Sequence, residues 1–140
     1  MRNTAREAAL NVIFAQQFNT DYVDALKKKI FKQFKLEKED DVLFAADLIA
    51  CVEEHRAELI TGIEDACHHY KENRINPMDK SILLIAMAEI RYFDEIPSVV
   101  SVSEATGLAR KYSTEKSADF VNGVLSGVIN KKVEEQNENC

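Results

Sequence analysis

Apolar residues recur along this chain at spacings of three and four, the period of an α-helix, and no stretch alternates apolar and polar residues as a half-buried strand would. Helical spacing marks residues 4–18 and 21–35 and continues through residues 42–66. The pattern slips near residues 51–57, so we predict two helices there rather than one long one. These features predict an all-α protein.

A second set of helices is predicted after a polar link at residues 70–75. Asn76 and Pro77 form a strong helix start, because asparagine is a good N-cap and proline fits the first turn. The helix that follows, to residue 93, is apolar on nearly every side, which is typical of a helix at the centre of a bundle. Two more helices are expected after Pro97.

Cap signals predict where three of these helices begin. Thr4 with Glu7 and Ser101 with Glu104 have the spacing of a capping box, in which two side chains satisfy free backbone N–H groups. Ser117 stands just before the last apolar stripe. We therefore expect helices to start at Thr4, Ser101 and Ser117.

Together these elements make about seven helices, for which two packed three-helix-like bundles are the natural architecture. The polar link would divide a single domain, residues 1–140, into an N-terminal half at about 1–72 and a C-terminal half at about 76–133. Residues 132–140 are polar and are expected to fray.

Charge is unevenly distributed along the chain. The 140 residues carry a net charge of −6, but residues 37–65 hold ten acids against two bases, a local charge of −8, which leaves the rest at +2. An acidic protein can still bind nucleic acid through a local basic face, although its non-specific affinity should be weak.

Several function classes find no support in the sequence. It has no P-loop, Gly-rich dinucleotide motif, nucleophile elbow or HExxH, so we expect no enzyme and no cofactor. It also has no signal-peptide pattern and no apolar run near the roughly 18 residues of a membrane helix. Three cysteines without framework spacing suit a reducing compartment. We expect a soluble, cytoplasmic protein with no membrane association.

A metal site is a minor alternative. Cys51 and His55 have helical i, i+4 spacing, and Cys67 is followed by His68 and His69, all of them zinc-compatible ligand types. The spacing lacks a CxxC, however, and a buried thiol beside surface imidazoles explains the same residues. We expect no metal.

Two blocks of the sequence resemble the NusB family of transcription antitermination factors. The first is residues 5–14, AREAALNVIF, which is similar to the family's opening helix. The second is a series of short motifs in the family's order: DKSIL at 79–83, EIRY at 89–92, DEIP at 94–97, SEA at 103–105, LARKY at 108–112 and FVNGVL at 120–125. FVNGVL is the most specific of them.

The resemblance implies both a fold and a function. It implies two three-helix-like bundles that bind the boxA element of leader RNA together with NusE, a small-subunit ribosomal protein. In the family, that heterodimer joins the transcription elongation complex, mainly on ribosomal RNA operons.

The residue types suited to RNA binding fall in two places. Cations bind phosphates, free N–H groups at a helix start do the same, and aromatic and amide side chains contact bases. With the resemblance, these rules give the following RNA-binding candidates: Arg2, Arg6, Gln16, Arg110, Lys111, Tyr112, Lys116, Ser117, Phe120 and Asn122.

Plainer interpretations stay open for several candidates. Arg2 and Arg6 alone would usually be solvated charges, Phe120 could be a core residue, and Asn122 could satisfy backbone groups beside Gly123. The lysines at 27–35 are best interpreted as a solvated face, with an electrostatic contribution as the lesser alternative.

The sequence departs from the family pattern where partners bind. Asn3 and Thr4 replace part of an arginine-rich N-terminus, which should weaken RNA binding, whereas Lys116 stands where the family often has an acid. For NusE, the resemblance implies contacts at Phe18, Arg74 and Asp79, of which Arg74 is not the acid often found there.

Two other functions remain as alternatives. A helical adaptor could keep the partner surface but lose RNA recognition, which the thin N-terminal basic charge would favour. An RNA-targeting domain akin to that of certain ribosomal RNA cytosine-5 methyltransferases is the other.

Overall fold

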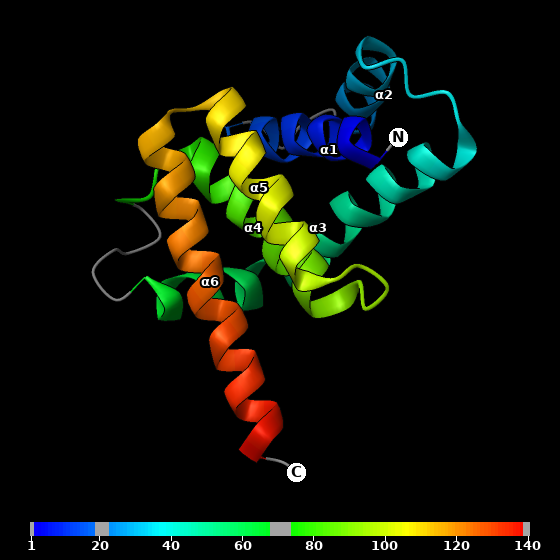
Figure 1. Ribbon diagram of the computed structural model, residues 1–140. Helices are drawn as coiled ribbons and strands as arrows, with labels where there is room; N and C mark the ends of the chain where they lie inside the picture. Colours follow the sequence, from blue (N-terminus) through cyan, green and yellow to red (C-terminus); the bar gives the residue numbers. More distant parts are fainter. Residues whose placement is uncertain (1, 19–22, 68–73, 139–140) are drawn as a thin grey trace.

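The computed structural model describes residues 2–18, 23–67 and 74–138, with side chains described for residues 2–18, 24–67 and 74–131. This part of the chain forms six α-helices and no strand (Figure 1). They are α1 (Arg2–Gln16), α2 (Val23–Gln33), α3 (Glu39–Ala66), α4 (Pro77–Tyr92), α5 (Ser98–Tyr112) and α6 (Glu115–Glu138). The all-α prediction is confirmed, and the expected count of about seven helices is close.

The difference in count lies in α3, which is a single helix of 28 residues with a kink. His55 leaves helical geometry, with φ −108° and ψ 16°, inside the segment where the apolar pattern slips. The kink lets Val52 before it and Leu59 after it both face the core. The predicted position of the break is therefore confirmed, but the chain bends there instead of separating into two helices.

The cap at Asn76 is confirmed, whereas the cap at Thr4 is wrong. The Asn76 side chain accepts a hydrogen bond from the backbone N–H of Met78, 2.8 Å away. Helix α1 already begins at Arg2, so Thr4 lies inside its first turn. Glu7 is then free of any capping role, and its carboxylate contacts α5 instead.

The two later caps are also wrong. Helix α5 begins one turn early, with Pro97 as its N-cap, and Ser101 is buried. Helix α6 begins at Glu115, because the Thr114 hydroxyl already accepts from the Ser117 N–H at 3.0 Å. The same spacing of residue types also occurs inside helices. A capping-box pattern therefore predicts that a helix is present more reliably than it predicts the residue at which the helix begins.

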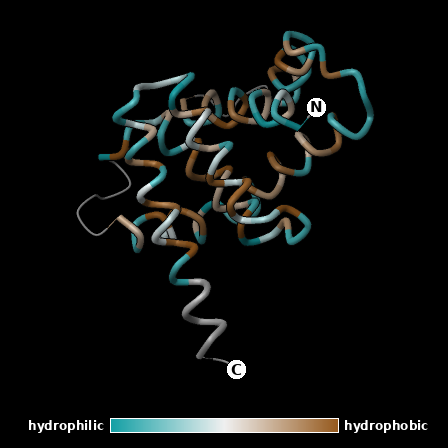
Figure 2. Tube along the Cα trace, in the orientation of Figure 1, coloured by the Kyte–Doolittle hydropathy of each residue, from teal (hydrophilic) through white to brown (hydrophobic). Residues whose placement is uncertain are grey.

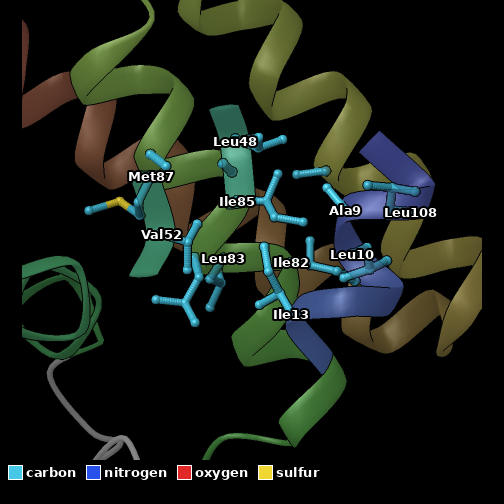
Figure 3. Packing of buried hydrophobic residues seen from close by; sticks show 14 of the residues in the cluster. Ala9, Leu10, Ile13, Leu48, Val52, Ile82, Leu83, Ile85, Met87 and Leu108 are labelled. Atoms are coloured by element: carbon cyan, nitrogen blue, oxygen red, sulfur yellow. The ribbon is translucent and has the colours of Figure 1, made fainter. Parts of the chain in front are cut away.

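Helix α4 lies at the centre of the bundle, as its uniform apolarity predicted. It packs against α1, α3, α5 and α6. In Figure 3, Ile82 and Ile85 of α4 lie among side chains of α1 and α3, and Leu108 of α5 lies beside Leu10 of α1. The hydropathy colouring shows brown residues on these inner turns and teal on the loops (Figure 2). One apolar cluster includes residues from all six helices, and the division into halves at 1–72 and 76–133 stays a prediction.

A buried ion pair joins α1 to α4 through the core. Arg6 and Glu89 are 4% and 1% exposed, and the Arg6 Nη2 and Nε atoms donate to the two Glu89 oxygens at 2.7–3.1 Å. The Ser101 hydroxyl of α5 donates to the same carboxylate at 3.2 Å. The guanidinium carbon of Arg6 also lies 5.3 Å from the ring centroid of Phe44 on α3. Four helices therefore meet at one charged pair.

The end of α2 is a left-handed cap without glycine. Lys35 has φ 52°, its N–H donates to the Lys32 carbonyl, and the Leu36 N–H donates to the Phe31 carbonyl, both at 3.0 Å. This is the Schellman hydrogen-bond pattern, whose left-handed position favours glycine because a Cβ is strained there.

Lys35→Gly should therefore stabilise the protein, by about 0.5–1 kcal/mol, because it removes that strain. Thermal unfolding would show the gain as a higher Tm. Lys28→Gly is the control, since glycine inside a helix costs about 1 kcal/mol relative to alanine. Equal destabilisation by both variants would contradict the cap assignment.

Arg6→Met should destabilise the protein by about 3–5 kcal/mol, because it leaves the Glu89 carboxylate buried without its cation. The double variant Arg6→Met with Glu89→Leu should recover most of that loss, since no charge is then stranded. Urea unfolding of the three proteins measures both effects. A double variant as unstable as the single one would show that the apolar packing, not the charge, carries the effect.

Candidate RNA and partner interface

The two stretches of predicted RNA-binding residues come into contact through Glu7. The Lys111 ammonium and the Tyr112 hydroxyl both donate to Glu7 Oε1, the latter at 3.1 Å. The C-terminal end of α5 is thus held against α1, and the hydrogen bond to Glu7 raises the pKa of Lys111. Partial burial raises the pKa of Tyr112. Sequence reasoning missed Glu7 because its spacing suggested a capping role.

Most of the predicted cations already have a carboxylate partner. Arg6 is buried against Glu89, Arg110 Nε lies 2.8 Å from Glu115 Oε2, and Lys111 pairs with Glu7. Arg6 in particular is a structural residue rather than an exposed phosphate ligand in this conformation. Four cations of the set are exposed, and two of these, Arg2 and Lys116, have no carboxylate partner among the described residues.

Arg2 and Gln16 lie at opposite ends of α1. The guanidinium carbon of Arg2 lies 4.7 Å from the ring centroid of Phe44, a cation–π contact that leaves the side chain exposed. Gln16 is 8% exposed, and its Nε2 donates to Glu53 on α3 at 2.7 Å. This amide therefore faces α3 rather than solvent.

Phe18 is prominently exposed just beyond α1. It is 66% exposed and makes an edge-on contact with Phe14, with ring centroids 5.2 Å apart. The preceding Gln17 donates to the Pro77 carbonyl at 2.8 Å and to the Ser81 hydroxyl. The end of α1 is thereby tied to the start of α4, so Phe18 is presented on a fixed support.

A hollow of about 260 Å³ lies between the starts of α4 and α6, and we call it the α4–α6 hollow. Its walls bring together residues assigned to the partner and residues assigned to RNA, which the sequence had kept apart. They are Arg74, Ile75, Asn76, Asp79, Thr114, Lys116, Ser117 and Phe120.

Asp79 is the buried acid of the α4–α6 hollow. It is 6% exposed, and its Oδ2 accepts from the Ser117 hydroxyl at 3.1 Å. Its Oδ1 is buried without a hydrogen-bond partner, the sole such side-chain atom among the described residues. Burial raises the pKa of Asp79, and the hydroxyls of Ser117 and Ser113 oppose that rise. Asp79 is therefore a buried acid in the wall of the hollow whose capacity to accept hydrogen bonds is not fully used.

Asn122 and Arg110 lie in a different depression, a groove of about 440 Å³ between α5 and α6. The Asn122 amide donates to the Thr106 hydroxyl at 3.4 Å and accepts from Ser126. Phe120, by contrast, is half-buried against the core at the α4–α6 hollow. The structure thus separates Asn122 and Arg110 from Lys116, Ser117 and Phe120.

Neither a metal cluster nor a membrane helix is found in the described part of the chain. No three side chains of His, Cys, Asp or Glu gather there in an arrangement that could hold an ion. His68 and His69 lie outside the described residues. No described helix combines the length and apolarity needed to span a bilayer.

Sequence comparison gives a consistent family assignment. The NusB family model matches residues 3–130. The transcription antitermination protein NusB of Natranaerobius thermophilus is 36% identical over 131 residues, covering 92% of this chain and 94% of that protein. The NusB protein of Listeria innocua is 34% identical over 127 residues, covering 91% and 94%.

Solved structures show the same fold. A chain in the crystal structure of antitermination factors NusB and NusE in complex with dsRNA matches with a TM-score of 0.85 at 23% identity, over 93% of this chain and 96% of that one. T. maritima NusB matches with a TM-score of 0.82 at 25% identity, over 90% and 88%. With the family model covering nearly the whole chain, this protein belongs to the NusB family of non-enzymatic transcription antitermination proteins, as its motifs predicted.

Proposed function

We propose that this protein binds boxA-type single-stranded leader RNA together with the NusE ribosomal protein, and that the assembly joins the elongation complex on ribosomal RNA operons in the cytoplasm. The coarser class, a transcription antitermination protein, follows from the family. The observation that carries the finer proposal is the α4–α6 hollow. There the partner candidates Arg74 and Asp79 lie beside three of the RNA candidates, which are Lys116, Ser117 and Phe120.

The chemistry of the α4–α6 hollow supports an RNA ligand. Lys116 supplies a positive charge, Phe120 an aromatic ring, and Ser117 a hydroxyl, all close to the start of α6. RNA-binding proteins use such combinations to hold a phosphate beside an unstacked base. A small movement of the residues around Asp79 would let its Oδ1 accept from a base amino group or from a backbone N–H of the partner.

A joint complex with NusE has separate support. One structure that shares this fold holds NusB, NusE and RNA together. Phe18 is the most exposed aromatic side chain described here, and the hydrogen bond of its neighbour Gln17 to Pro77 holds it near the start of α4, which bears Asp79. We propose Phe18, Arg74 and Asp79 as the NusE contacts. Aromatic side chains are enriched at protein–protein interfaces, where they fill pockets on the partner.

A helical adaptor that binds NusE but not RNA is the second candidate. It is favoured by the ion pairs that already neutralise Arg6, Arg110 and Lys111. No contact in the described residues favours the methyltransferase-type RNA-targeting domain over these two.

Gel shifts across a salt series should separate the two candidates. We expect boxA-type RNA to bind better than a scrambled RNA of equal length, and NusE to tighten that binding, because the few unpaired cations make RNA affinity weak without the partner. An adaptor would bind NusE and ignore both RNAs. Equal binding of both RNAs, with and without NusE, would reject the proposal.

Lys116→Glu should weaken RNA binding without unfolding the protein, because the side chain is exposed and an acid suits the start of α6. Loss of one phosphate contact predicts about a fivefold weaker complex at about 0.1 M salt and a shallower salt dependence. Lys131→Glu, exposed further along α6, is the matched control. If both variants bind like the parent protein, Lys116 does not contact RNA.

A further inference from the structure

The outer face of α2, together with the cap residue that follows it, carries a concentrated group of exposed lysines. We call Lys28, Lys29, Lys32 and Lys35 the α2 lysine face. On the other side of α2, Leu26, Ile30 and Phe34 pack against the core. The amphipathic pattern of this helix therefore fixes the direction of the lysines, which point to solvent because the apolar side faces inward.

These lysines are not neutralised by local ion pairs. None of the four has a carboxylate within ion-pair distance among the described residues. The acids nearest in sequence are Asp24, one turn before Lys28, and Glu37, two residues after Lys35, which is followed by the acidic first turn of α3. Glu37 and Asp41 line the same hollow as Lys35, but no ion pair joins either of them to it. The lysine face is thus a local positive region on a protein whose net charge is −6.

Helix α2 lies beside the part of α1 that carries the candidate RNA-binding residues. The two helices pack together, and in Figure 1 α2 stands at the N-terminal end of α1. Thr4 of α1 lines the same hollow as Phe34 and Lys35. The lysine face therefore begins next to the first turn of α1, where Arg2 is exposed.

We infer that the α2 lysine face is a second, sequence-independent contact for RNA phosphates, one that holds the single-stranded RNA running beyond the recognised element. This inference rests on the proposed function. The proposed function leaves few cations available for RNA phosphates, since three of the five cations among the RNA-binding candidates are paired with carboxylates. The four lysines of the α2 lysine face supply unpaired positive charge in place of those three residues.

The composition of this face favours RNA over an acidic protein partner. Lysine is depleted at protein–protein interfaces, whereas aromatic residues are enriched there. Among the α2 residues whose side chains are described, the other exposed ones are Asp24, Ala25 and Gln33, so none of them offers a large apolar anchor. Lys28 and Lys32 are one helical turn apart, about 6 Å along the axis, so adjacent cations can follow a flexible phosphate chain.

The test compares a short and a long RNA. The short RNA holds only the boxA-type element, and the long one adds about ten nucleotides of single strand on each side. The variant Lys28→Gln with Lys32→Gln removes two charges but keeps helix propensity and length. The matched control, Arg56→Gln with Lys131→Gln, removes two charges from α3 and α6. Thermal unfolding of all three proteins should coincide.

We expect the α2 variant to bind the short RNA like the parent protein but to lose affinity for the long one. Two lost phosphate contacts lower the salt slope by about 1.4, so between about 50 and 200 mM salt the parent's affinity should fall about sevenfold further than the variant's. The control should follow the parent protein. Discrimination between boxA-type and scrambled sequence should not change.

The outcomes separate this inference from the proposed function. If the parent protein prefers boxA-type RNA and the α2 variant binds the long RNA equally well, the lysine face is not an RNA contact and the proposed function stands. If the parent protein shows no sequence preference but the variant still loses affinity and salt slope, the face is supported and boxA recognition is rejected. If the parent protein does not bind the long RNA, both are rejected.

Discussion

The buried pair of Arg6 and Glu89 is the contact on which the arrangement of the other helices depends. It joins α1 to α4, and it draws in Ser101 of α5 and Phe44 of α3. An apolar core tolerates small rotations of its helices, but a buried charge pair has one good geometry, and a mismatch strands a charge. The pair therefore sets how α1 and α5 lie on α4, and so where the α5 end meets Glu7.

This arrangement makes intramolecular pairing a main determinant of the RNA surface. Lys111 and Arg110 lie at the end of α5 with carboxylates already against them, from α1 and from the start of α6. Because exposed ion pairs are weak, RNA phosphates could replace those carboxylates at a modest cost in free energy. That cost lowers the affinity of the protein for RNA. A protein of this kind needs either a partner that adds contacts or additional unpaired cations, and the proposed roles of NusE and α2 correspond to these two needs.

The α4–α6 hollow shows how the fold brings the candidate site together. The cap at Asn76 fixes the start of α4 and the bond from Thr114 fixes the start of α6, so Asp79 and Ser117 face each other. Gln17 ties the end of α1 to the same place. Phe18, the hollow and the α6 start therefore form one supported surface rather than three loose segments.

Local patterns in the sequence were enough to specify the all-α class, the central position of α4, the Asn76 cap and the site of the break in α3, because each depends on residues within a few turns of one another. The family followed from motifs such as FVNGVL, matched over residues 3–130. The role of Arg6 did not follow, since its partner Glu89 is 83 positions away and nothing local shows that this arginine is buried. The pairing of Glu7 with Lys111 across 104 positions, and the separation of Asn122 from Lys116, likewise depend on how the helices pack. Charge type is a property of each residue, but whether a charge is free to bind RNA depends on which distant side chains the fold places beside it.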